Sequence, residues 1–83
     1  MSNLINSPVD GASAEVLEAF RAHRGFELKI RAGDFAAPFF LNLTQSEGRK
    51  MLRHYCVNNP SYLAGKSVNA YFSGSKLVGI GLD

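Results

Sequence analysis

The sequence predicts an α+β fold, in which a mostly antiparallel four-stranded sheet carries its helices packed on one face. Three observations predict it: an amphipathic segment with helix-ending residues near the N-terminus, strict alternation over residues 26–32, and a capping box at Thr44–Glu47. The predicted element order is α-β-β-α-β-β. With 83 residues, of which 46% are hydrophobic and 19% charged, the chain has the composition of a globular protein with one small core.

The first predicted helix covers residues 14–24. Ser13 can cap its N-terminus, and Gly25 suits the left-handed residue that follows many helices. Acidic residues precede basic ones along the segment, as the helix dipole favours. The apolar positions at helical spacing, which we expect to form its buried stripe, are Val16, Leu17 and Phe20.

Before this helix, residues 1–12 are mostly polar or turn-forming and are predicted to be a flexible N-terminal arm. Residues 13–83 are predicted to form the single α+β domain.

Two strands are predicted next, over residues 26–32 and 39–43. In the first, apolar and charged residues alternate without exception, which is typical of a strand with one face in the core and one in water. Gly33-Asp34 and Pro38 lie between the two strands and predict a loop that connects them as a hairpin.

A second helix is predicted over residues 45–58. Thr44 and Glu47 have the spacing of a capping box, and Asn58-Asn59-Pro60 predicts the end. Gly48 lowers helix propensity by about 1 kcal/mol, so tertiary packing is expected to support this turn. The expected buried stripe consists of Met51, Leu52, Tyr55 and Cys56.

Residues 67–73 and 76–82 predict a C-terminal β-hairpin around Gly74-Ser75, a dipeptide that suits a type II′ turn. In that register Ser73 faces Lys76, Phe72 faces Leu77 and Tyr71 faces Val78. Both faces of the hairpin are then apolar, which a sheet covered on one side does not need. We therefore expect a second chain to cover one face and a homodimer to form. The predicted interface residues are Tyr71, Val78, Ile80 and Leu82. The alternative is that the N-terminal arm folds over this face.

A basic surface is predicted on the second helix. Arg49 and Arg53 are four residues apart, as are Lys50 and His54, so each pair lies on one side of a helix. Lys66 adds to the basic C-terminal half. Such a surface can bind phosphates or an acidic protein, and its alternative role is that of an ordinary solvated helix face. The net charge of +2 excludes mimicry of nucleic acid.

Enzymatic, metal and membrane functions find little support. The single cysteine, Cys56, excludes an internal disulfide framework, and one Cys with two His residues does not suggest a structural zinc site. Cys56 and His54 are two residues apart and project from different sides of a helix, so they form no nucleophile–base pair. We expect no catalytic residues, no metal and no cofactor. Neither a signal peptide nor a membrane-spanning run is visible, so a cytoplasmic location is expected.

These observations favour a small non-enzymatic protein-binding module. Because small proteins of this kind are often encoded by phages or mobile elements, we expect an inhibitor that occupies a surface of a host defence or transcription machine. The first alternative is a dimeric nucleic-acid-binding module that uses the basic helix face, and it predicts salt-sensitive binding. The second alternative is an enzyme or small-ligand binder whose site forms at an oligomer interface.

Overall fold

A computed structural model describes residues 11–33 and 35–82. The elements in chain order are the strands β1 (Ala12–Ala22), β2 (Gly25–Ala32) and β3 (Phe39–Thr44), the helix α1 (Gln45–His54), the 3₁₀ helix η1 (Pro60–Leu63), and the strands β4 (Ser67–Ser73) and β5 (Lys76–Leu82). The prediction for residues 1–10, as part of a flexible arm, lies outside the described residues. Ala12, assigned to that arm, already belongs to β1.

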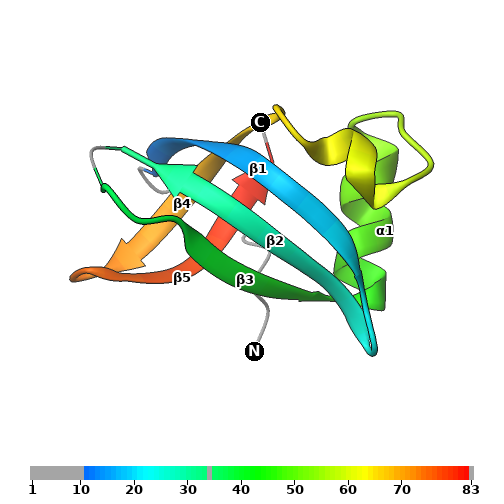
Figure 1. Cartoon of the computed structure of the whole chain (residues 1–83), viewed down its shortest axis with the longest axis horizontal. Coiled ribbons are helices and arrows are strands. Elements are labelled where there is room, and N and C mark those ends of the chain that lie inside the picture. The colour runs from blue at the N-terminus through cyan, green and yellow to red at the C-terminus, as the bar shows by residue number, and fades with distance from the viewer. Residues whose placement is uncertain (1–10, 34, 83) are drawn as a thin grey trace.

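The five strands form one antiparallel sheet in the order β3-β2-β1-β4-β5. The sheet curls into a nearly closed barrel, with β3 and β5 approaching each other across the seam (Figure 1). The fourth strand returns to lie beside the first, which is the Greek-key arrangement. A partly open five-stranded Greek-key barrel is the architecture of the OB-fold. The predicted four-stranded α+β sheet with helices on one face is therefore wrong.

The main error concerns the predicted helix over residues 14–24, which is the strand β1. A register shift between Val16 and Glu18 interrupts the pairing of β1 with β2. Because a β-bulge adds one residue to its strand, the inward positions become Val16 and Ala19, three residues apart as in a helix. Phe20, predicted to be core, lies on the outer face and is 46% exposed.

The structure confirms the strands predicted over residues 26–32 and 39–43, which are β2 and β3. Phe26, Leu28 and Ile30 are buried, while the charged residues between them face outward. Gly25 starts β2 with φ of 155°, and a β carbon there would overlap the backbone carbonyl oxygen of Leu43 on β3. Only glycine permits this close approach of the two strands.

The capping box at the start of α1 is also confirmed. The backbone N–H of Glu47 donates to Thr44 Oγ1 at 3.1 Å, and the Thr44 N–H donates to Glu47 Oε1 at 2.9 Å. The helix ends at His54, four residues earlier than predicted. Val57 N–H donates to the Leu52 carbonyl and Cys56 N–H to the Arg53 carbonyl, which together form a Schellman motif. Cys56 has φ of 57° in this motif and is exposed, so the prediction that it is buried is wrong.

The C-terminal hairpin has the predicted strands and turn. Gly74 has φ of 64°, and Ser75 is not among the residues with positive φ, which agrees with a type II′ turn. Ser73 faces Lys76 and Phe72 faces Leu77, as predicted. A register shift then leaves Val78 without a partner and places Tyr71 opposite Gly79, so the predicted Tyr71–Val78 pair is wrong.

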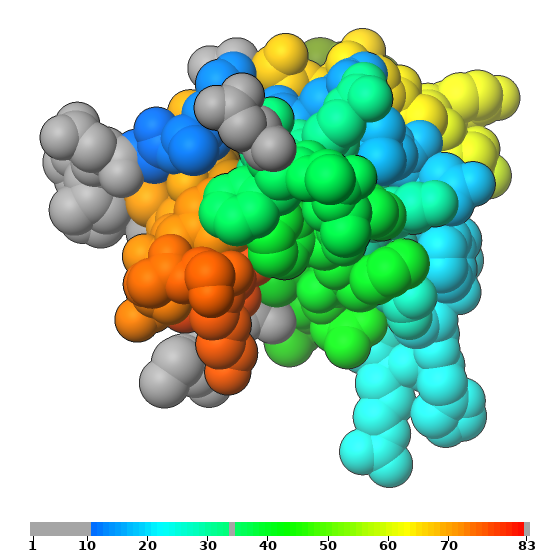
Figure 2. Space-filling view, turned by 60° about the vertical axis from the view of Figure 1, so that its left-hand side comes forward, coloured from blue at the N-terminus to red at the C-terminus, as the bar shows by residue number. Residues whose placement is uncertain are grey.

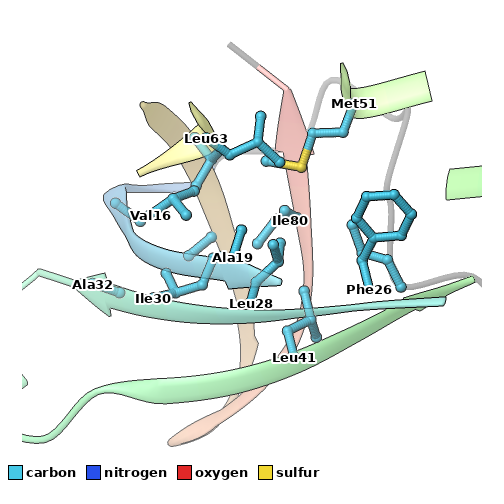
Figure 3. Close-up of a cluster of buried hydrophobic side chains, with 14 of the residues drawn as sticks. Val16, Ala19, Phe26, Leu28, Ile30, Ala32, Leu41, Met51, Leu63 and Ile80 are labelled. Atoms are coloured by element: carbon cyan, nitrogen blue, oxygen red, sulfur yellow. The ribbon is translucent and has the colours of Figure 1, made fainter. Parts of the chain in front are cut away.

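The hydrophobic core fills the barrel interior (Figure 3). Side chains from β1, β2, β3 and β5 point toward one another, and Met51 of α1 and Leu63 of η1 close the interior from one end. Residues of β4 complete the core. Its fully buried large members are Val16, Phe26, Leu28, Ile30, Met51, Leu63, Val68 and Ile80, together with Pro60. No helix among the described residues has the length and apolar character that a membrane span requires.

Candidate functional site at the basic end of the barrel

The four residues predicted to form the basic helix face, Arg49, Lys50, Arg53 and His54, are all exposed on α1. They are exposed because Gly48, Met51 and Leu52 occupy the buried side of the helix. Lys66 is half-buried and lies outside the helix. Its neighbour Ser67 accepts a hydrogen bond from Tyr55 Oη at 2.6 Å, so this part of the backbone borders the C-terminal end of α1.

A second group of cations belongs to the turn between β1 and β2. Arg21 and Arg24 are exposed there, with His23 between them. Gly25 pairs with Thr44, the residue that caps α1, so this turn and the first turn of the helix lie at the same end of the barrel (Figure 1). Figure 2 shows the side chains of the β1–β2 turn, in cyan, projecting away from the body of the molecule.

Phe26 connects the two groups. The guanidinium carbon of Arg21 is 5.4 Å from the centre of the Phe26 ring, a cation–π distance. The same ring lies against the α-carbon of Gly48 on α1. Arg21 therefore sits beside the helix turn that precedes Arg49. We call the group Arg21, Arg24, Arg49, Lys50 and Arg53 the basic end.

Charge is unevenly distributed over the residues that the structure describes. The basic end holds five of the nine Lys and Arg residues, and Glu47 is the one carboxylate within residues 21–26 and α1, so the sum there is 5 − 1 = +4. Arg21, Arg24, Arg49 and Arg53 form no ion pair with another described residue. The outer face of β1 and β2 instead carries two cations and three carboxylates, a sum of 2 − 3 = −1: Lys29, Arg31, Glu15, Glu18 and Glu27.

Cross-strand ion pairs account for the cations on that outer face. Arg31 donates to Glu15 Oε1 at 2.9 Å, and Lys29 Nζ is 3.9 Å from Glu18 Oε2. Both pairs join residues directly opposite in the β1–β2 register. These cations already pair with carboxylates, whereas Arg21, Arg24, Arg49 and Arg53 pair with no carboxylate among the described residues.

Exposed aromatic side chains lie near the basic end and on the adjoining sheet face. Phe20 is the residue before Arg21 and is 46% exposed, while Phe40, opposite Lys29 on β3, is 65% exposed. Both rings stand on the outer face of the sheet. Each ring therefore has a cation as its neighbour, Arg21 beside Phe20 in the chain and Lys29 opposite Phe40.

A shallow pocket of about 350 Å³ lies beside the turn between β1 and β2 and is lined by His23, Arg24, Phe26 and Asn42 among others. A larger groove of about 650 Å³ runs along α1 past Gln45, Ser46, Arg49, Leu52 and Arg53. Both hollows border arginines of the basic end. Within the residues that the structure describes, no cluster of three or more His, Cys, Asp or Glu side chains is placed to hold a metal ion.

The predicted apolar interface on the C-terminal hairpin does not form one surface. Ile80 is fully buried in the chain's own core, opposite Ala70. Tyr71 and Leu82 are half-buried, and Val78, at the register shift, is 40% exposed. The extra residue at Val78 turns Ile80 inward, so these four residues do not share a face.

Sequence reasoning missed Arg21, Arg24 and Phe20 as surface residues because it placed them in a helix. One signal could have found them. Gly25 stands directly before the strictly alternating strand 26–32, which is where a hairpin turn preceding that strand would be expected. A comparison of the chain with protein-family models, curated proteins and solved structures found no match.

Proposed function

We propose that the protein binds single-stranded nucleic acid, with the basic end contacting phosphates. The observation that carries this proposal is the segregation of charge, +4 at one end of the barrel against −1 on the neighbouring sheet face. Arginines of the β1–β2 turn and of α1 can donate charge-assisted hydrogen bonds to phosphate oxygens. The adjoining grooves give a backbone room to lie between them.

The exposed aromatic rings favour a single strand over a duplex. Phe20 and Phe40 stand on the outer face of the sheet with their rings in solvent. Bases in a duplex are stacked on one another, whereas those of a single strand can stack on aromatic side chains. OB-fold barrels commonly bind oligonucleotides on the face of their second and third strands, where Phe40 lies here. That likeness is one of architecture and supports the proposal only as an analogy.

The protein-binding module favoured by the sequence loses its main support. It rested on an apolar hairpin face, and the burial of Ile80 removes the centre of that face. Host-directed inhibition, a homodimer and a cytoplasmic location have no further observation behind them. The site as proposed is complete in one chain.

The test is a fluorescence-anisotropy titration with labelled oligonucleotides of about 16 nucleotides, the upper end of the site size for one such barrel. Wild-type protein is expected to bind the single strand more tightly than the matching duplex. The double variant Arg49→Glu/Arg53→Glu should weaken binding by about tenfold or more, since it removes two phosphate contacts.

The matched control compares two single variants, Arg53→Glu in the basic end and Lys76→Glu at the exposed start of β5, beside the hairpin turn, which change the net charge by the same amount. Lys76→Glu should weaken binding much less than Arg53→Glu. Equal losses for the two single variants would show that net charge, and not the basic end, accounts for the binding. Tighter binding to the duplex would contradict the single-strand assignment.

A further inference from the structure

A small groove between β1 and η1 adjoins the outer sheet face. It has a volume of about 260 Å³ and is lined by Glu18, Ala19, Phe20, Ser61 and Ala64. The exposed ring of Phe20 supplies its large apolar surface. The groove lies one residue along β1 from Arg21, so a strand held at the basic end can reach it.

The walls of this groove are held firmly in place. Leu63 of η1 is fully buried in the core. Next to it, Val16 of β1 donates its N–H to the Lys66 carbonyl at 3.0 Å and accepts from the Gly65 N–H at 2.7 Å. These contacts fix the backbone of η1 against that of β1, so the backbone walls of the groove are ordered before a ligand binds.

The polar side chains of the groove are hydrogen-bond acceptors. The Glu18 carboxylate accepts only. The Ser61 hydroxyl donates its proton to Asn59 Oδ1 at 3.0 Å, which leaves its oxygen free to accept. A polar group that binds these two side chains therefore has to donate hydrogen bonds to them.

We propose that the groove holds one base of the bound strand, stacked on Phe20, and that it prefers bases with an exocyclic amino group. This inference rests on the proposed function. Cytosine and adenine present N4 and N6 amino groups, which carboxylate and hydroxyl oxygens can accept. Thymine and uracil present carbonyl oxygens on either side of one N–H, and those oxygens would face the acceptors of the groove.

The negative charge of Glu18 does not prevent a phosphate backbone from passing nearby. Lys29 Nζ is 3.9 Å from Glu18 Oε2, and both side chains remain partly in solvent. The lysine offsets the charge of the carboxylate at that point. Glu18 thus selects among bases while adding little net repulsion.

The experiment compares the affinities of labelled oligo(dC), oligo(dA) and oligo(dT) of equal length. Wild-type protein is expected to bind oligo(dC) and oligo(dA) about tenfold more tightly than oligo(dT), the discrimination typical of a well-made base contact. Phe20→Ala should weaken binding to all three oligonucleotides by about tenfold through loss of stacking.

Glu18→Gln should narrow the difference in affinity between oligo(dC) and oligo(dT), because the glutamine amide can donate a hydrogen bond to a thymine carbonyl oxygen. Glu27→Gln, which removes a carboxylate of the same sheet face outside the groove, is the control and should keep the difference. Equal affinity for the three oligonucleotides, with Arg49→Glu/Arg53→Glu still weakening binding, would contradict base selection by the groove and would leave the proposed function standing. No binding to any of them would overturn both.

Discussion

Gly48 of α1 lies so close to Phe26 of β2 that a β carbon at position 48 would overlap the Phe26 ring. Phe26 is fully buried and cannot move aside without disturbing the core. The contact lets the helix approach the open end of the barrel, and it brings the arginines of α1 to the same end as the β1–β2 turn. It also explains why a residue with low helix propensity stands inside the helix.

Gly48→Ala is therefore expected to destabilise the protein. Alanine improves helix propensity by about 1 kcal/mol, but overpacking a buried ring costs about 1–3 kcal/mol, and the stiffness of the site puts the cost at the upper end. The free energy of unfolding in urea should fall. Ser46→Ala, on the exposed side of the same helix, is the control and should change it little. A more stable Gly48→Ala protein would mean that α1 does not pack on Phe26.

Phe20 and Phe26 should respond oppositely to truncation. Phe26→Ala removes a fully buried ring and should cost about 3–5 kcal/mol, much of the stability of so small a domain. Phe20→Ala removes a ring that is nearly half exposed and should cost about 1 kcal/mol or less. Thermal unfolding of the two variants measures this. Similar losses would indicate that β1 is rotated relative to the structure.

Ile80→Asp is expected to unfold the chain, because it places a carboxylate in the barrel interior with no partner. Val78→Asp, two residues earlier on the exposed register shift, should leave a folded protein. Circular dichroism spectra of the two variants show which of them is folded. A folded Ile80→Asp protein would restore the surface-exposed hairpin face that the sequence predicted.

Cys56→Gly is expected to stabilise the protein by about 1 kcal/mol. Cys56 adopts φ of 57° at the position of the Schellman motif where glycine is usual, and a side chain there is strained. The midpoint of thermal unfolding should rise. Cys56→Ala keeps the β carbon and should give no comparable rise, so equal stabilisation by both would show that the thiol, and not the backbone, is the source of strain.

Features with a local cause could be predicted from the sequence. The capping box of Thr44 and Glu47, the alternation of residues 26–32 and the turn at Gly74 each involve neighbours within a few residues. The exposure of Arg49 and Arg53 followed from the predicted helix.

Features that depend on long-range pairing could not be predicted. β1 is held by β2 on one side and β4 on the other, and its bulge spaces Val16 and Ala19 as a helix would. The extra residue at Val78 likewise reverses which side of β5 faces the core. Arg21 and Arg24 therefore joined the candidate site only when the barrel brought the β1–β2 turn to α1.

The salt dependence of binding tests most directly whether the four arginines at the basic end contact phosphates. Affinity for a single-stranded oligonucleotide would be measured over a range of salt concentrations for wild-type protein and for Arg49→Gln/Arg53→Gln. With four phosphates neutralised, the plot of log affinity against log salt should have a slope of about −2.8, and the variant should reduce it to about −1.4. A wild-type slope near zero, or one unchanged in the variant, would contradict the account.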